Sequence, residues 1–335
     1  MNTCIETKLD TEFKRDVFAG LTAFPKFLYS KYIYDKKGDK LFQDIMNLDE
    51  YYLTNSEFEI FSEYKKAICE LFRGNGQGFD LIELGAGDGK KTKVLLEYMN
   101  NNGFDFVYKP IDISQNAIDS LQQTLAEELP NVTVRPERGE YFEVLERLHK
   151  FNKRKKVIMV LGSNIGNLLH HRAIEFLARL RNTMNEEDLI FMGFDQKKEP
   201  QTILDAYNDP QGVTEAFNKN LLERINRELD GNFDLDKFKH WEVYDPETGT
   251  AKSYLVAQES MTVSIDAISL TVKFDPWETI HTEISQKYDD KVVEWLTDEA
   301  GLKAVTSYTD GKGYFKDYFF RRAEGASAVN DFQKL

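Results

Sequence analysis

The stretch FDLIELGAGDGKKTKVLLEYM, residues 79–99, decides the fold class of this chain. Its apolar run, Phe79 to Leu84, predicts a buried strand, and its later apolar residues, Val94 to Leu96, predict a helix. The glycines between them allow the backbone to turn tightly and to approach a ligand closely. A strand, a glycine turn and a helix in this order predict a site where helix N–H groups can face a carboxylate or a phosphate.

Strand and helix patterns alternate along the chain around this stretch. Apolar runs predict strands at residues 106–111, 132–134, 157–161 and 189–194. Amphipathic patterns predict helices at about residues 57–72, 114–129, 141–148 and 174–180. Ser56 and Glu59 have the spacing of a capping box for the first of these helices, and Ser114 can cap the second. The alternation is typical of a doubly wound α/β fold, a parallel sheet covered on both faces with its ligand at the carboxyl ends of the strands.

The outer parts of the chain have different patterns. Residues before Ser56 are rich in aromatic side chains and show little periodicity, whereas residues 207–229 predict a helix and residues 252–283 predict antiparallel strands. A helix near 292–296 and a hairpin over 303–321 would complete the first sheet. We therefore expect two discontinuous domains, the second of α+β type. Their predicted extents are residues 58–196 with 286–335, and residues 1–57 with 197–285.

Composition limits the partners and the compartment. The 335 residues carry a net charge of −14, which argues against binding a phosphate backbone, because nucleic-acid sites need clustered Lys and Arg. Two cysteines give no disulfide framework, and no window has the roughly 20 apolar residues of a membrane span. No signal peptide is visible. We expect a soluble, cytoplasmic protein with a small-molecule partner and no nucleic-acid or membrane partner.

The spacing of the glycines and the neighbouring acids bear on the cofactor. Gly85, Gly87 and Gly89 give G-x-G-x-G, whereas a dinucleotide fingerprint would read G-x-G-x-x-G. Glu83, at the end of the strand, suits a sulfonium-bearing nucleoside better than a pyrophosphate, and Asp112 can accept hydrogen bonds from ribose hydroxyls. A nicotinamide-dependent oxidoreductase remains the alternative for this loop.

Several segments resemble, in order, the histidine-specific, S-adenosylmethionine-dependent methyltransferases, including the histidine α-N-methyltransferase of ergothioneine biosynthesis. They are KYIYDKKGDKLFQDI (31–45), EYYLTNSE (50–57), IELGAGDGKKT (82–92), PIDIS (110–114), LGSNIGN (161–167), AYNDPQGVTEAFNKNLLERINREL (206–229) and IHTEISQKY (280–288). The last three are the most specific. The resemblance runs from about Phe13 to Arg321 and implies a Rossmann-like class I methyltransferase sheet with a discontinuous substrate-binding domain.

The resemblance also implies which residues hold S-adenosylmethionine. Gly85, Gly87 and Lys91 would lie against its methionyl part, and Asp112 would hold the ribose. Glu140 and Tyr141 stand where the family commonly has Asp-Phe beside the adenine. Glutamate keeps the hydrogen-bond acceptor there with a longer reach.

For the amino-acid substrate, the resemblance implies a second group of residues. Asn167 and Tyr207 would hold the carboxylate, and the Gly162 carbonyl would lie near the amine. Tyr51 would line the amine and carboxylate region as the candidate catalytic residue. The side-chain pocket would be formed by Tyr34, Phe42, Ser253, Glu283 and Ser285. A carboxylate and a hydroxyl suit the two nitrogens of an imidazole.

Ser253 departs from the family pattern, because mycobacterial-type sequences have a methionine there. Related fungal members methylate a tryptophan derivative, so the family does not fix the acceptor. Without the resemblance, each of these residues has an ordinary structural interpretation. Glu283 would be a surface charge, and Asn167 would belong to a turn. Tyr51 and Phe42 would be core packing residues. His170 and His171 are adjacent without i, i+4 spacing, so we expect a helix start with solvated imidazoles and no metal site.

The expected reaction is N-methylation of the α-amine of a free amino acid, L-histidine, up to the trimethylated form. The alternatives are the same chemistry on another amino acid or amine, an oxidoreductase, a methyltransferase acting on protein or nucleic acid, and a non-catalytic cofactor-binding scaffold. The sequence identifies no general base: Tyr51 or bulk water could take the amine proton. It does not give the number of methyl groups, the oligomeric state or the downstream pathway.

Overall fold

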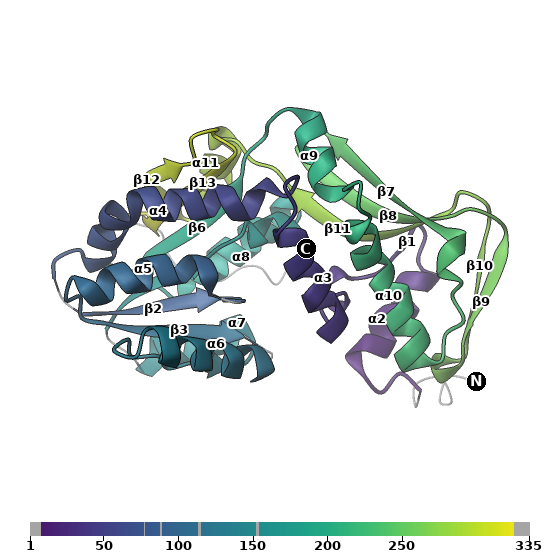
Figure 1. Ribbon diagram of the computed structural model, residues 1–335, viewed down its shortest axis with the longest axis horizontal. Coiled ribbons are helices and arrows are strands. Elements are labelled where there is room, and N and C mark those ends of the chain that lie inside the picture. Colours follow the sequence, from purple (N-terminus) through teal and green to yellow (C-terminus); the bar gives the residue numbers. More distant parts are fainter. Residues whose placement is uncertain (1–7, 77, 88, 113–114, 152–153, 325–335) are drawn as a thin grey trace. The chain divides into compact units, whose positions relative to one another are not determined.

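The computed structural model describes residues 8–76, 78–87, 89–112, 115–151 and 154–324. The chain forms two compact units, drawn in Figure 1. Unit 1 comprises residues 1–52 and 198–285, and unit 2 comprises residues 53–197 and 286–335. The chain therefore passes from one unit to the other after Tyr52, Lys197 and Ser285, where the sequence predicted domain boundaries after residues 57, 196 and 285.

The first boundary differs because helix α4 (Tyr52–Arg73) begins about one turn before the predicted start at Glu57. Ser56 and Glu59 do not form the predicted capping box. The Ser56 hydroxyl instead donates to the Asp310 carboxylate at 3.3 Å, and the Glu59 carboxylate accepts from the Gly311 N–H at 2.9 Å. These two residues therefore fasten α4 to a distant turn rather than capping its own N-terminus.

Unit 2 is built on a sheet in which the described residues supply seven strands, in the order β12-β13-β6-β5-β2-β3-β4. Strands β6, β5, β2, β3 and β4 are parallel, whereas β13 is antiparallel to β6 and β12 is antiparallel to β13. The strands are β2 (Phe79–Leu84), β3 (Phe106–Asp112), β4 (Glu137–Arg138), β5 (Lys155–Val160), β6 (Leu189–Asp195), β12 (Leu302–Thr309) and β13 (Phe315–Arg322).

Helices cover both faces of this sheet, which is why every residue of β2 and β6 is buried. On one face, the core includes apolar residues of β2, β5 and β6 together with α7, α8 and α11. On the other, Phe61 and Phe72 of α4 place their rings 5.7 and 5.6 Å from that of Phe191. The helices are α5 (Lys90–Asn101), α6 (Gln115–Glu128), α7 (Tyr141–Phe151), α8 (His170–Asn182) and α11 (Asp290–Glu299). The predicted α/β fold with a mainly parallel sheet is confirmed.

Details of unit 2 separate correct from incorrect predictions. The closing hairpin is confirmed by the antiparallel pairing of β12 with β13. The predicted strand at 132–134 is wrong: Val134 makes an isolated bridge to Tyr108, and the strand is β4 instead. Pro136, which has no N–H to donate, separates the bridge from the strand. Asp88 and Ser114 lie outside the described residues.

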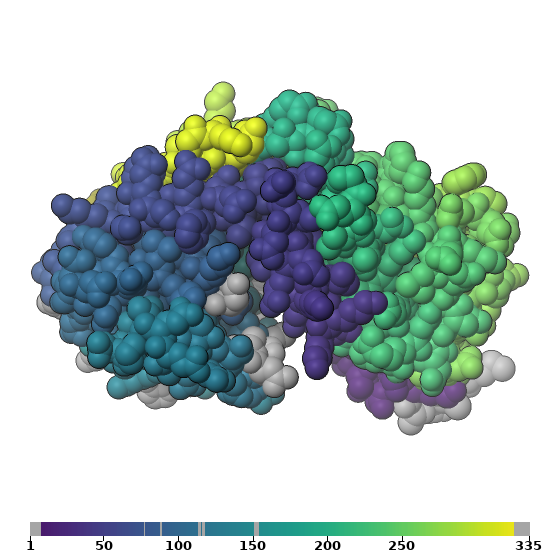
Figure 2. Space-filling view, in the orientation of Figure 1, coloured from purple at the N-terminus to yellow at the C-terminus, as the bar shows by residue number. Residues whose placement is uncertain are grey.

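The α4 and α5 helices adjoin, with Cys69 Sγ 3.9 Å from the Leu95 carbonyl oxygen. Their side chains form a continuous blue surface in Figure 2.

Unit 1 contains a sheet with the strand order β1-β11-β8-β7 and a ribbon of β9 and β10. The strands are β1 (Lys26–Phe27), β7 (Phe238–Asp245), β8 (Thr250–Ala257), β9 (Met261–Ile265), β10 (Leu270–Phe274) and β11 (Thr279–Gln286). The antiparallel pair of β9 and β10 lies within the predicted range 252–283 and matches the prediction. The β7 strand, which pairs antiparallel with β8, was not predicted, and β1 joins β11 in parallel. Buried and exposed residues alternate along β7, so this strand has one covered face.

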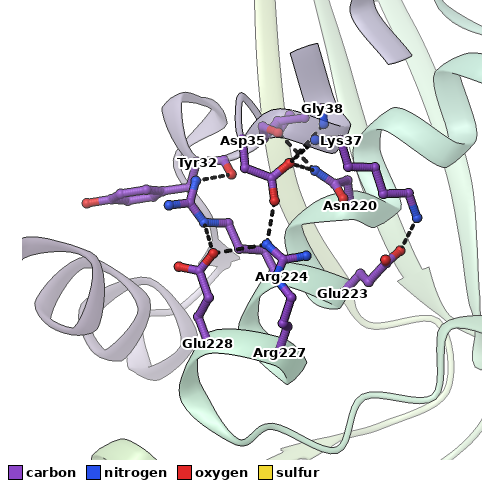
Figure 3. A network of polar contacts seen from close by, with 10 residues as sticks. Tyr32, Asp35, Lys37, Gly38, Asn220, Glu223, Arg224, Arg227 and Glu228 are labelled. Atoms are coloured by element: carbon purple, nitrogen blue, oxygen red, sulfur yellow. Dashed lines mark hydrogen bonds and ion pairs between the residues drawn. The ribbon is translucent and has the colours of Figure 1, made fainter. Parts of the chain in front are cut away.

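The described residues of unit 1 also form the α-helices α2 (Glu12–Thr22), α3 (Lys36–Met46), α9 (Pro200–Tyr207) and α10 (Val213–Leu229). Weak periodicity before Ser56 gave no prediction for α2 and α3. Figure 3 shows what holds α3 against α10. The Asp35 carboxylate caps α3 by accepting from the N–H groups of Lys37 and Gly38. It also accepts from the Asn220 amide at 2.9 Å and pairs with Arg227, both on α10.

Candidate active site

The glycine turn after β2 has the backbone conformation that its sequence predicts. Gly85, Gly87 and Gly89 have φ angles of +71°, +56° and +66°, which side-chain-bearing residues rarely adopt. A Cβ on Gly85 would lie 2.8 Å from the Tyr141 hydroxyl, and one on Gly89 would lie 2.5 Å from Leu121. Apart from its chain neighbours, no heavy atom of the described residues lies within 4 Å of the position that a Cβ on Gly87 would have.

A small recess adjoins this turn. It is lined by Ala86, Gly87, Pro110, Asp112, Ile118 and Leu121. Asp112 ends β3, which is parallel to β2, so the carboxylate and the glycine turn lie at the same edge of the sheet. Apolar side chains beside an acceptor carboxylate suit a purine nucleoside, whose base is flat and whose ribose carries hydroxyl donors. The residues that line the recess are therefore of the kinds that the predicted nucleoside cofactor would contact.

Glu140 and Tyr141 lie at the start of α7, beside this recess. The Gly139 N–H donates to the Asp112 carbonyl at 3.1 Å, which ties the segment to the end of β3. Desolvation, followed by the negative charges of Asp112 and Glu140, raises the pKa of Tyr141 to about 12. The structure thus brings Tyr141 together with Gly85 and Asp112, and the predicted contact of Tyr141 with the adenine stays a prediction.

Glu83 has a different environment from the one the sequence suggested. It is 3% exposed, and its oxygens accept from the Thr92 hydroxyl at 2.9 Å and the Tyr108 hydroxyl at 2.6 Å. Desolvation raises its pKa to about 7. Glu83 therefore braces α5 and β3 against β2, and its contact with a cofactor stays a prediction.

Lys91, in the first turn of α5, forms an ion pair with Glu57 of α4. The Glu57 carboxylate also accepts from the Gly162 N–H, which lies 2.9 and 3.0 Å from its two oxygens. Gly162 follows β5 and has a φ angle of +67°. One carboxylate thus joins the helix after β2 to the turn after β5.

The turn after β5 also carries Asn167. This residue ends the short 3₁₀ helix η2 (Asn164–Asn167) and its side chain is exposed. The Tyr288 hydroxyl donates to the Ile165 carbonyl at 3.1 Å, and a Cβ on Gly166 would lie 3.0 Å from the Gln286 carbonyl oxygen. The backbone that presents Asn167 is therefore fixed by close packing within unit 2.

In unit 1, the predicted aromatic residues form one cluster, which we call the aromatic wall. Ring centroids are 5.6 Å apart for Tyr34 and Phe42, 6.3 Å for Phe42 and Tyr51, and 6.4 Å for Tyr51 and Tyr207. Phe217 of α10 lies 5.4 Å from Tyr34 and 5.9 Å from Phe42. The sequence indicated Phe217 only as part of a helical stripe, since periodicity does not distinguish a wall residue from a core residue.

Polar predicted residues of β11 adjoin the aromatic wall. The Tyr207 hydroxyl and the Ser285 hydroxyl share a hydrogen bond of 2.7 Å. Desolvation, followed by the negative charge of Glu283, raises the pKa of Tyr34 well above its ordinary value. The structure therefore brings Ser285 to Tyr207 and Glu283 near Tyr34, two members of the aromatic wall.

Ser253 is placed differently. It is 2% exposed on β8, and its hydroxyl donates to the Glu242 carboxylate of β7 at 2.6 Å. Its carbonyl accepts from the Thr282 hydroxyl at 3.1 Å. None of these contacts reaches the aromatic wall, so the pocket role of Ser253 stays a prediction. Glu242 was missed, although its place between apolar positions of a strand is a sequence signal.

The histidine pair begins α8, as expected. His171 is exposed, but His170 is partly buried, with its ring 5.5 Å from that of Trp295, so the expectation of two solvated imidazoles is wrong for His170. Within the described ranges, no group of three or more His, Cys, Asp or Glu side chains could hold a metal ion. No helix in the same ranges is long and apolar enough to cross a membrane.

Comparison with known proteins identifies the family. A family described as histidine-specific, SAM-dependent methyltransferases matches residues 13–322. The chain is 34% identical over 302 residues to the histidine N-alpha-methyltransferase of Mycolicibacterium smegmatis, covering 90% of this chain and 92% of that protein. With the same coverage it is 33% identical to the histidine N-alpha-methyltransferase of Mycobacterium tuberculosis. It is 30% identical over 289 residues to ergothioneine biosynthesis protein 1 of Schizosaccharomyces pombe, covering 84% of this chain and 37% of that longer protein.

These similarities decide the cofactor that the glycine spacing left open. The cofactor is S-adenosylmethionine, and the alternative of an oxidoreductase on a dinucleotide fold is excluded. The recess lined by Gly87 and Asp112 stays the predicted position of its nucleoside. The chain is a methyltransferase enzyme, and it belongs to the histidine-specific, S-adenosylmethionine-dependent methyltransferase family.

Proposed function

We propose that this enzyme methylates the α-amine of free L-histidine, up to the trimethylated product. The observation that carries the proposal is the meeting of Glu283, Ser285 and Tyr207 at the aromatic wall of unit 1. A carboxylate accepts from an imidazole N–H, and a hydroxyl can donate to the other ring nitrogen. Two relatives that match nine tenths of this chain are named histidine N-alpha-methyltransferases, which supports this choice of acceptor.

In unit 2, the described residues provide for the cofactor. S-adenosylmethionine, when bound, supplies a methyl group on a sulfonium that an amine can displace. Asp112 would accept hydrogen bonds from the ribose hydroxyls, and the open backbone at Gly87 leaves room for close approach. The Lys91 ammonium would attract the carboxylate of the methionyl part. No step in this scheme needs a metal ion.

The amine must be neutral and aligned before it can displace the sulfonium, because a protonated amine has no free electron pair. Tyr51 is the proposed residue at the amine, with bulk water as the other route for the proton. We propose that Tyr207 and Asn167 bind the carboxylate of the amino acid and that the Gly162 carbonyl orients its amine. The rings of Tyr34 and Phe42 would flank the side chain that Glu283 and Ser285 recognise.

A second candidate function is the same reaction on another amino acid, such as a tryptophan derivative. The feature that favours it is Ser253, which the resemblance sets against a methionine of mycobacterial-type sequences. The hydroxyl of Ser253 is held by Glu242, so the polar character of this position is built into the strands.

The test is methyl transfer from S-adenosylmethionine to a panel of amino acids, with products identified by mass. We expect methylated histidine. Replacing Glu283 by Gln should lower kcat/KM for histidine about 10- to 150-fold, the equivalent of about 1.5–3 kcal/mol for a hydrogen bond to a charged group. Ser285→Ala should have a smaller effect in the same direction.

The matched control is Glu259→Gln in the same unit, because Glu259 is exposed and pairs with Lys237. Its kcat/KM should equal that of the unchanged enzyme. Methylation of tryptophan without histidine would favour the second candidate. Equal effects of Glu283→Gln and Glu259→Gln would contradict the recognition role of Glu283.

A further inference from the structure

Two buried carboxyl groups meet beside the glycine turn of unit 2. Glu57 on α4 and Asp317 on β13 are both fully buried, although 260 residues separate them in the sequence. Asp317 pairs in register with Gly193 of β6, and a Cβ on Gly193 would lie only 2.6 Å from a Glu57 carboxylate oxygen. The missing side chain of Gly193 therefore provides the space that the Glu57 carboxylate occupies.

The cation available to this pair is Lys91, whose ammonium contacts Glu57. Neither oxygen of Asp317 has a donor partner among the described residues. Desolvation and the charge of Glu57 raise the pKa of Asp317 well above its ordinary range, and the charge of Lys91 opposes this only in part. The raised pKa of Asp317 favours its protonated form, and the Glu57 carboxyl group is the one that contacts the Lys91 ammonium.

We propose that Glu57 is the positioning residue of this methyltransferase, because its carboxylate fixes both the Lys91 ammonium and the backbone turn at Gly162. The inference rests on the proposed roles of Lys91 toward the cofactor and of Gly162 toward the amine. Asp317 serves Glu57 by donating its proton, so that the pair carries a single negative charge.

The geometry explains why one side chain can serve both. Glu57 accepts a hydrogen bond from the Gly162 N–H, which lies 2.9 and 3.0 Å from its two oxygens, so the Gly162 carbonyl is not used in this contact. Lys91 Nζ lies 3.6 Å from the position that a Cβ on Gly162 would have, so the ammonium is close to this turn. A shift of the carboxylate therefore moves the ammonium and the turn together, so cofactor binding and acceptor binding change in step.

The experiment compares Glu57→Gln with unchanged enzyme in two measurements. Titration calorimetry with S-adenosylhomocysteine reports the cofactor side, and the KM for histidine at saturating S-adenosylmethionine reports the acceptor side. An amide keeps one acceptor oxygen and turns its NH₂ group toward the other donor, so we expect the Kd for S-adenosylhomocysteine and the KM for histidine each to rise about tenfold. Glu59→Gln, two residues along the same helix, is the control, and it should change neither quantity more than twofold.

An effect on melting temperature without a change in Kd or KM would overturn the proposal, because Glu57 would then serve the fold alone. If Glu57→Gln does not fold, Lys91→Gln carries the test. The proposal requires that variant to weaken S-adenosylhomocysteine and histidine binding together, and a change in neither or in only one contradicts it. The unchanged enzyme could also bind S-adenosylhomocysteine and yet methylate no amino acid. That result would refute the proposed acceptor, but the calorimetric comparison of Glu57→Gln with unchanged enzyme would still test the role of Glu57 toward the cofactor.

Discussion

Two buried or half-buried acidic groups, one in each unit, are held in opposite ways. Asp35 in unit 1 is surrounded by donors: two backbone N–H groups, the Asn220 amide and the Arg227 guanidinium (Figure 3). Asp317 in unit 2 has no donor partner within the described residues and faces another carboxyl group. The donors around Asp35 stabilise its negative charge, whereas the surroundings of Asp317 favour its uncharged, protonated form.

The pKa shifts follow from these surroundings. Desolvation acts to raise the pKa of Asp35, but hydrogen bonds from the Gly38 N–H, Asn220 and Arg227 outweigh it and lower the pKa. For Asp317, desolvation and Glu57 act in the same direction and raise it. The comparison teaches that donors, rather than burial alone, determine whether an acidic side chain stabilises the fold as an anion.

The largest expected effect concerns the pH dependence of stability through Asp317. A folded-state pKa above the unfolded value of about 3.9 means that the stabilisation is complete below pH about 3.9 and is lost as pH rises toward the folded pKa. Asn is a neutral match for the protonated acid. Asp317→Asn should therefore gain stability relative to the unchanged protein as pH rises from 5 to 8, measured by urea unfolding. A difference that is constant across this range would mean that Asp317 is charged in the folded protein.

Asp35→Ala should have the next largest effect. It removes the cap of α3 and two contacts from α10, and loss of such a cap costs about 1–2 kcal/mol. The urea midpoint should fall accordingly at pH 7. The lowered pKa of Asp35 makes its contribution present above pH about 3.9 and lost as pH falls below that value, so the two proteins should converge in acid. Equal midpoints at pH 7 would show that α3 does not depend on this cap.

Lys37→Ala should have the smallest effect. Lys37 pairs with Glu223 at the edge of the same network, where the two side chains are 51% and 39% exposed. An exposed pair of this kind contributes about 0–1 kcal/mol, since water and salt screen it. We expect a change near the limit of detection by urea unfolding, diminishing further in high salt. A loss as large as that of Asp35→Ala would contradict the distinction between the two contacts.

Much of unit 2 was predictable because its strands are nearly continuous apolar runs. The β2 and β6 strands, the glycine turn and the hairpin of β12 and β13 follow from local patterns. In unit 1, α3 escaped prediction because its position depends on Asp35 contacts with α10, which follows more than 170 residues later. The start of α4 was misplaced because Ser56 binds Asp310 rather than its own helix.

The candidate site divides in the same way. Gly85, Gly87 and Asp112 were predictable, since turns and strand ends have local signals, whereas most acceptor residues rested on the family resemblance. Glu57 and Asp317 each carry a signal that was not used, an acidic residue on an apolar face of a helix or a strand. A pattern of this kind predicts a buried charge but not its partner.

The sequence by itself determined the α/β class, the glycine turn and the family, because periodicity and motifs record local burial and local backbone conformation. Only the tertiary structure decided that Glu57, Lys91, Gly162 and Asp317 share one cluster, and that Ser253 is bound to Glu242. Such contacts depend on strand order and register, which bring together side chains far apart in the chain. Their protonation depends in turn on which donors that packing supplies.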